Sequence, residues 1–179
     1  IAEEIAQGLD IEDLWRPFFA VSANLSRYDL VEHDRGLLWR ALRATCAIPA
    51  LVPPALDHGD VLVDGAVLDN LPVVPMSRRC GGHIVACDVA SVPTMRADPE
   101  LTAAPSGGRL LLQRLLPRSM RKQVPGITSI ITHSLVCSSV IQRRRALELA
   151  DLVLQPRVEH VGLLQFERYE ELEEIGYRA

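Results

Sequence analysis

The chain has 179 residues, a length that predicts one domain with a sizeable buried core. Hydrophobic residues make up 48% and charged residues 23%, a globular composition that excludes intrinsic disorder. The net charge of −4 lacks the basic footprint of a nucleic-acid-binding protein, so no nucleic-acid partner is expected. The four cysteines stand far apart without a C-x-x-C pair, which predicts buried thiols in a reducing compartment and no metal site.

The first predicted elements come from the spacing of apolar residues. Residues 1–9 have the period of a helix, residues 17–22 form a short β-like run, and residues 37–45 predict a second helix. A polar turn is expected at residues 23–29. Three prolines between residues 49 and 54 end the second helix and extend the chain.

The central stretch of the chain is a short apolar run that ends in Asp64, Gly65 and Ala66. Residues 61–63 predict a buried strand that delivers one carboxylate into a tight turn. Gly65 permits a backbone angle that other residues adopt only with strain, and Ala66 leaves room for a neighbouring group. Asn70 is expected to cap the next helix. The alternative is purely structural, because Asp-Gly between apolar runs is also a common hairpin turn.

A second buried strand is predicted at residues 83–89, whose continuous apolar run is typical of a strand covered on both faces. Because strands alternate with helices, including one at residues 73–79, we expect an α/β sandwich with a mainly parallel sheet. Asp88 ends this second strand and is interpreted as a loop cap. Residues 143–145, three arginines, are interpreted as a solvated turn.

The second half of the chain begins with a proline-rich excursion at residues 91–126. Its apolar helix at residues 110–116 is flanked by cations, which fits a helix lying on a lipid surface or a lid packed on its own domain. Residues 127–150 predict the longest helix, with apolar residues on two sides, and residues 152–156 predict a strand. An acidic helix is expected at residues 166–177.

Common catalytic motifs are missing from the sequence. The 179 residues contain no G-x-S-x-G nucleophile elbow, no H-E-x-x-H zinc motif and no G-x-x-x-x-G-K phosphate loop. The five histidines do not cluster. His58 lies near the Asp64 turn, but a single loop histidine is more often solvated than catalytic.

Six short runs, in order, resemble the patatin-like phospholipases and in particular their neuropathy-target-esterase branch. These runs are residues 11–20 (IEDLWRPFFA), 38–40 (LWR), 43–49 (RATCAIP), 53–54 (PP), 64–66 (DGA) and 70–72 (NLP). The resemblance continues through the strand to Asp88 and the final helix, and so covers nearly the whole chain. Two positions depart from the usual pattern: Ala66 stands where many relatives have a second glycine, and Thr45 stands where a serine is usual.

The resemblance implies a serine esterase with a patatin-like three-layer α/β sandwich. In that family a serine on a G-x-S-x-G elbow attacks the ester carbonyl, and the aspartate of D-G-[GA] takes its proton without a histidine between them. Asp64 is therefore expected to be the catalytic base, with Gly65 and Ala66 as the supporting turn. A carboxylate is a weak base for a hydroxyl, so it must be held rigidly in a dry site. No cofactor and no metal are implied.

The elbow and the oxyanion loop are expected upstream of Ile1. Residues 1–179 are therefore expected to be the C-terminal portion of one patatin-like domain, truncated at its N-terminal side and inactive alone. The expected substrates are phospholipids or lysophospholipids, with a membrane surface as a further partner. The expected location is the cytoplasm or the cytoplasmic face of a membrane. The alternative is a catalytically inactive module that binds membranes or serves as a scaffold.

Overall fold

A computed structural model describes residue 6 and residues 8–89, 127–158, 160–161 and 165–179. The chain forms two compact units, one of Ile1–Ser91 with Val136–Ala179 and the other of Val92–Leu135. The helix predicted at residues 110–116 lies outside the described residues, as does most of the helix predicted at residues 1–9.

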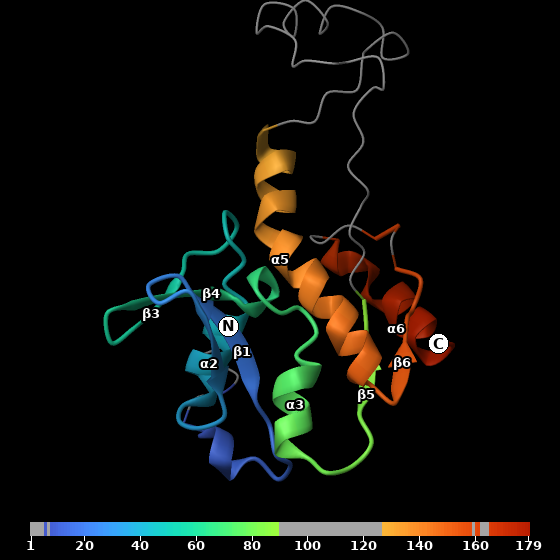
Figure 1. The fold of residues 1–179 in the computed structure, drawn as a ribbon, viewed down its shortest axis with the longest axis horizontal. Helices are drawn as coiled ribbons and strands as arrows, with labels where there is room; N and C mark the ends of the chain where they lie inside the picture. Colours follow the sequence, from blue (N-terminus) through green and yellow to red (C-terminus); the bar gives the residue numbers. More distant parts are fainter. Residues whose placement is uncertain (1–5, 7, 90–126, 159, 162–164) are drawn as a thin grey trace, which may run out of the picture. The chain divides into compact units, whose positions relative to one another are not determined.

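The helices and strands follow the predicted order, with two additional strands (Figure 1). They are η1 (Ile11–Asp13), β1 (Ala20–Asn24), β2 (Asp29–His33), α2 (Leu38–Thr45), β3 (Ala55–Asp57), β4 (Asp60–Asp64), η2 (Gly65–Val67), α3 (Val73–Arg79), β5 (Val85–Cys87), α5 (Ile127–Leu149), β6 (Leu152–Leu154), η4 (Phe166–Arg168) and α6 (Tyr169–Tyr177). The helices at residues 37–45, 73–79, 127–150 and 166–177 are confirmed to within a few residues. Strands β2 and β3 were not predicted.

The larger sheet has four strands in the order β2-β1-β4-β3, and each neighbouring pair is antiparallel. Two hairpins generate it. In the β3–β4 hairpin, His58 and Gly59 have φ angles of 46° and 91°, as a two-residue turn between right-twisted strands requires. In the β1–β2 turn, the Asn24 side chain accepts backbone hydrogen bonds from Ser26 (2.8 Å) and Arg27 (3.1 Å).

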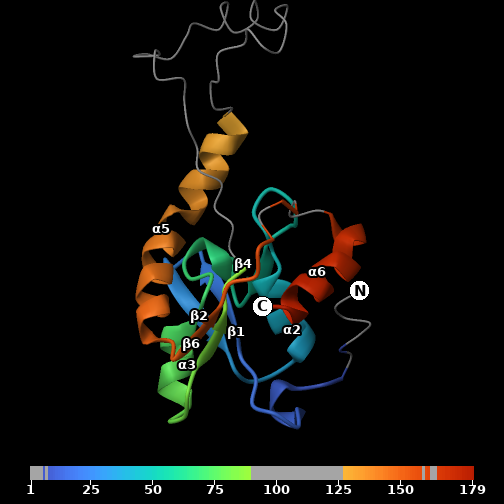
Figure 2. The same ribbon diagram turned by 90° about the vertical axis from the view of Figure 1, so that its right-hand side faces the viewer.

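A second, two-stranded sheet pairs β5 with β6 in parallel, with Val85 opposite Leu152. The α/β class and the parallel pairing are confirmed, whereas the four-stranded sheet is antiparallel and not parallel as expected. The difference arises because β1–β2 and β3–β4 are tight hairpins, which join antiparallel strands, while α2 connects β2 and β3 at opposite edges of the sheet. Figure 2 shows the strands between α3 and the C-terminal part of α5 on one side and α2 and α6 on the other.

Two groups of buried apolar residues hold the first unit together. The larger joins α3, β5 and α5, and consists of Leu71, Val73, Ile84, Ala86 and Ala146. The smaller joins β1 to α2 through Ile11, Ala20 and Ala41, with Leu38 packed against it. Because α2 packs on β1, its last residue, Thr45, comes to lie beside the end of β4.

A buried ion pair connects the end of β5 to α5. The Asp88 side chain is 1% exposed, and it accepts hydrogen bonds from Arg143 (Nε, 2.7 Å) and from Gln155 (Nε2, 3.2 Å). Asp88 therefore forms a buried ion pair, which its interpretation as a loop cap did not include. Residues 143–145 belong to α5 and not to a turn; Arg144 and Arg145 are exposed as expected, whereas Arg143 is engaged by Asp88. The sequence interpretation failed here because the two charges are far apart in the chain.

Removing the cation of this pair should destabilise the fold strongly. Arg143→Met removes the Arg143 guanidinium from the buried Asp88 carboxylate, which we expect to lower the free energy of unfolding by about 3 kcal/mol in urea denaturation. Arg144→Met, an exposed neighbour on the same helix, is the matched control and should change it by less than about 0.5 kcal/mol. Equal unfolding midpoints for the two variants would show that the ion pair contributes little.

Several apolar side chains are more exposed than their patterns predicted. Val85 in β5 is 60% exposed and Ile141 in α5 is 70% exposed, so neither element is covered on both sides by the described residues. Among those residues, no helix is long and apolar enough to cross a membrane. The four cysteines are free, as expected, but three of them, Cys46, Cys87 and Cys137, are exposed and not buried.

Candidate active site

Asp64 is the last residue of β4, as the sequence predicted, and its backbone is fixed from two directions. It pairs with Ser22 of β1 across the sheet. On the other side, its N–H donates to the carbonyl oxygen of Ala47, just after α2, at 3.0 Å. The pairing with β1 and the hydrogen bond to Ala47 therefore hold the backbone of Asp64 in place, and with it the base of the carboxylate side chain.

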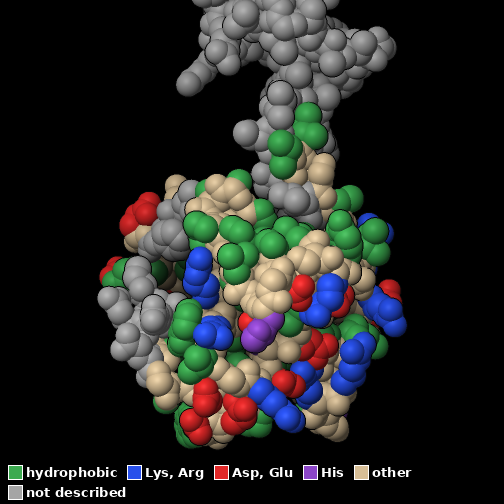
Figure 3. Space-filling model, turned by 90° about the vertical axis from the view of Figure 1, so that its left-hand side faces the viewer, with side chains coloured by type: hydrophobic (Ala, Val, Ile, Leu, Met, Phe, Trp, Pro, Cys, Tyr) green, Lys and Arg blue, Asp and Glu red, His purple; other side chains and the backbone are tan. Residues whose placement is uncertain are grey.

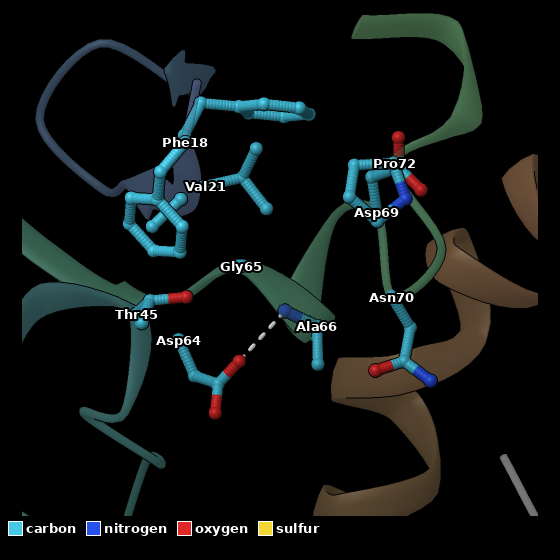
Figure 4. Close-up of a pocket in the computed structure, with 11 residues that line it drawn as sticks. Phe18, Val21, Thr45, Asp64, Gly65, Ala66, Asp69, Asn70 and Pro72 are labelled. Atoms are coloured by element: carbon cyan, nitrogen blue, oxygen red, sulfur yellow. Dashed lines mark hydrogen bonds between the residues drawn. The ribbon is translucent and has the colours of Figure 1, made fainter. Parts of the chain in front are cut away.

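The Asp64 side chain is held by the turn that follows it. Its Oδ1 atom accepts a hydrogen bond from the Ala66 N–H at 2.8 Å, which also caps η2 (Figure 4). The carboxyl group is half-buried, and burial raises its pKa above the ordinary value, while the Ala66 hydrogen bond opposes this rise. A raised pKa makes the ionised carboxylate a stronger base than a solvated aspartate.

Gly65 is required by close packing and not by its backbone angle. It does not have a positive φ, but a Cβ atom at this position would lie 2.6 Å from the carbonyl oxygen of Val21 and 2.7 Å from its Cγ2. The expectation of a special backbone angle is therefore wrong. So is the alternative of a hairpin turn, because Gly65 begins the short helix η2. The absence of a side chain allows the turn to pack against β1.

A pocket of about 320 Å³ lies where these elements meet, near the lower end of the range for small-molecule sites. It is lined by Phe18, Phe19, Ala20, Val21, Thr45, Asp64, Gly65, Ala66, Asp69, Asn70 and Pro72. Figure 4 shows Phe18 and Val21 on the opposite side of Gly65 from the Asp64 carboxylate. The pocket thus combines an apolar wall with carboxylates, a pairing of surfaces that suits a substrate with both an apolar and a polar part.

Asp69 provides a second carboxylate in the pocket, which the sequence analysis did not single out. Its N–H donates to the Gly65 carbonyl oxygen (2.8 Å), and its Oδ1 accepts from the Leu71 N–H (3.1 Å). Burial raises its pKa as well. Asp69, and not Asn70, therefore organises the turn before α3. Asn70 does not cap that helix, whose N-cap residue is Pro72.

Ser22, the serine opposite Asp64 in the sheet, is unsuited to be a nucleophile. Its side chain is fully buried, and its Oγ shares a hydrogen bond of 2.8 Å with Nε2 of His33. Burial lowers the pKa of His33. A hydroxyl with no exposed surface cannot reach an ester carbonyl, so we interpret this pair as a support for the strand that carries Val21.

The other residues singled out from the sequence lie in different settings. Thr45, the last residue of α2, lines the pocket. Although Cys46 is exposed, partial desolvation of its thiol and the charge of the Asp64 carboxylate raise its pKa. The His58 side chain is 92% exposed in the hairpin turn, in agreement with the solvated interpretation. The described residues contain no cluster of side chains that could hold a metal ion.

The part of the chain that forms the pocket is similar to known proteins. Residues 2–76 match the model of the patatin-like phospholipase family, and every residue that lines the pocket lies within that match. The chain is similar to proteins named lysophospholipase NTE1. It is 34% identical to the one from Meyerozyma guilliermondii over 94% of this chain, and 33% identical to the one from Candida albicans over 94%.

A third relative of the same name, from Mycosarcoma maydis, is 34% identical over 97% of this chain. The chain spans only 12% of the length of the first two relatives and 9% of the third. The α/β fold, the strand-and-turn that carries Asp64 and these similarities agree with one another. The chain belongs to the patatin-like phospholipase family.

Proposed function

We propose that the protein carrying this chain hydrolyses acyl esters of phospholipids or lysophospholipids through a Ser–Asp dyad in which Asp64 is the base. The observation that carries the proposal is the Asp64 carboxylate, half-buried in the wall of a pocket at the end of β4. The names of the relatives, lysophospholipases, support the substrate class.

In the proposed mechanism, Asp64 takes the proton of a serine hydroxyl as its oxygen attacks the ester carbonyl. Since Oδ1 already accepts the Ala66 hydrogen bond, we assign the proton transfer to Oδ2. The same amide hydrogen bond prevents rotation of the carboxyl group, which keeps Oδ2 directed at one place. The serine, on a G-x-S-x-G elbow, would be supplied from outside residues 1–179, which contain no such motif and form the C-terminal portion of the catalytic domain in this proposal.

The membrane surface is the proposed source of the substrate. Exposed apolar side chains support it: Leu51, Val52 and Leu56, in β3 and the loop before it, are between 38% and 77% exposed. Figure 3 shows hydrophobic side chains gathered across the upper part of one face. The four free cysteines support a reducing compartment, and we place the protein in the cytoplasm or on the cytoplasmic face of a membrane.

The pH dependence of lysophospholipid hydrolysis tests this function. Only the ionised Asp64 carboxylate accepts a proton, so kcat/KM should fall as the pH decreases through the pKa of that group. Because burial raises this pKa, the acid limb should lie above the ordinary aspartate value of about 3.9. The limb should persist in Asp69→Asn, which removes the other buried carboxylate of the pocket.

Two results would contradict the proposal. Hydrolysis without an acid limb would exclude a carboxylate base. Binding to phospholipid vesicles with no hydrolysis of any acyl ester at any pH would instead favour an inactive membrane-binding module.

A further inference from the structure

The apolar wall of the pocket includes Phe19, which is held from outside the pocket by a cation. The guanidinium carbon of Arg79 lies 4.4 Å from the centroid of the Phe19 ring. Arg79 is the last residue of α3, whereas Phe19 immediately precedes β1. This contact therefore fixes one wall of the pocket to an element that is not itself part of that wall.

Arg79 is itself fixed by acceptors on three sides. Its Nη1 donates to Glu32 of β2 and to the Pro75 carbonyl oxygen (3.2 Å), and its Nη2 donates to Asp34 at 3.0 Å. The side chain is only 28% exposed. A guanidinium held at both ends of its planar fork has one orientation, so the Phe19 ring stacked on it is restrained as well.

Phe19 gives the pocket an aromatic surface that suits the part of a lipid ester without polar groups. Asp64 and Asp69 are the two carboxylates that line the pocket, and Phe18, Phe19 and Val21 are among its apolar lining residues. If the ester carbonyl lies near Asp64, the acyl chain has its favourable surroundings along the aromatic residues, because burial of methylene groups drives its binding. Because Arg79 restrains the Phe19 ring, we expect the ring to move little when the substrate has a longer acyl chain.

We propose that Phe19 is the residue that selects the acyl-chain length of the substrate and that Arg79 is its positioning residue. This inference rests on the proposed ester hydrolysis at Asp64. Arg79 acts only through the ring, since it does not line the pocket. The Glu32–Arg79–Asp34 network thereby links the β2 end of the sheet to substrate selection.

The test compares variants of the protein that carries this chain on lysophosphatidylcholines with octanoyl, lauroyl and palmitoyl chains. Phe19→Ala and Arg79→Met should each change the ratio of kcat/KM between the palmitoyl and octanoyl substrates by about tenfold, mainly through KM. Arg79→Lys keeps the charge but loses the planar fork, so it should restore only part of the ratio. Arg78→Met is the matched control, because Arg78 is the exposed neighbour on α3 and also pairs with Glu32 (3.7 Å), whereas Arg79 is the arginine that stacks on the Phe19 ring.

A second variant at the same position distinguishes a change in substrate selection from a folding defect. Phe19→Leu leaves Arg79 and its acceptors unchanged, and should still alter the chain-length ratio because leucine fills less of the wall. Melting temperatures of all variants are measured alongside, so a changed ratio in a variant with an unchanged melting temperature supports the inference.

Binding of laurate, measured by isothermal titration calorimetry, separates the inference from the function on which it rests. Hydrolysis with the same chain-length ratio in Phe19→Ala, Phe19→Leu and wild type would overturn the inference and leave the function standing. Laurate binding that Phe19→Ala weakens, in a protein without hydrolysis, would overturn the function and support an acyl-binding wall. A wild-type protein that neither hydrolyses esters nor binds laurate would overturn both.

Discussion

Replacing Asp64 by asparagine, in the protein that carries this chain, should lower kcat for lysophospholipid hydrolysis by about a thousandfold. The asparagine side chain has the same shape, and its oxygen can still accept the Ala66 hydrogen bond, so the turn should keep its geometry. Only the ability to take a proton is lost. Steady-state hydrolysis of a lysophospholipid measures the effect directly.

The same substitution should leave the fold intact or slightly more stable at neutral pH. Burial raises the Asp64 pKa in the folded protein, so its contribution to stability is present at acidic pH and is lost as the pH rises through that pKa. The Asp64→Asn side chain carries no charge, so the variant does not lose stability as the pH rises. Asp57→Asn, on the exposed β3 strand, is the matched control and should retain activity. Full activity in Asp64→Asn would remove Asp64 from the mechanism.

Substituting Gly65 by alanine should disrupt both the fold and the activity. The new Cβ would lie 2.6 Å from the carbonyl oxygen of Val21, and neither backbone can move without breaking the β1–β4 pairing. We expect the free energy of unfolding to fall by about 2 kcal/mol, and hydrolysis to fall with it because the Asp64 turn shifts. Urea denaturation and ester hydrolysis measure the two effects.

Two further variants identify the cause of this effect. Gly81→Ala places a Cβ where no heavy atom lies within 4 Å, so it should change stability by less than about 0.5 kcal/mol. Adding Val21→Ala to Gly65→Ala removes the Cγ2 contact but keeps the carbonyl oxygen, so it should recover only part of the loss. A Gly65→Ala protein as stable and active as Gly81→Ala would refute the close-packing explanation.

The sequence predicted the elements whose cause is local. The apolar run before Asp64 predicted a strand that ends at that residue, and α3 begins and ends at the predicted residues. Helices α2 and α5 also have the predicted bounds to within one residue. In each case neighbouring residues determine the structure, so one stretch of sequence contains the necessary information.

The features that the sequence did not predict depend on distant partners. Nothing near Gly65 in the chain indicates that Val21 packs against it, and nothing near Asp88 indicates Arg143. Strand β3 was obscured by the prolines before it and by a turn made of histidine and glycine, a weaker hairpin signal than Asn-Gly. Without that hairpin, alternating strands and helices favoured a parallel sheet.

The candidate site likewise has one part that a local motif predicted and another that depends on distant residues. Asp64 and its turn could be named from one motif, whereas the second carboxylate, Asp69, has no sequence signal beyond the Asp-Asn pair. The aromatic wall is formed by Phe18 and Phe19, which precede Asp64 by more than forty residues and reach it only because β1 pairs with β4. The pocket depends on which residues of β1 lie opposite which residues of β4, and the sequence alone did not reveal this strand register.

The most direct test of a Ser–Asp dyad uses a fluorophosphonate probe, which reacts covalently with activated serines, on the protein that carries this chain. The labelled peptide is mapped by mass spectrometry in the wild type and in Asp64→Asn. We expect label on a serine within a Gly-x-Ser-x-Gly sequence, and much slower labelling in Asp64→Asn. Label at equal rates in both proteins, or no labelled serine in a protein that hydrolyses lysophospholipids, would contradict it.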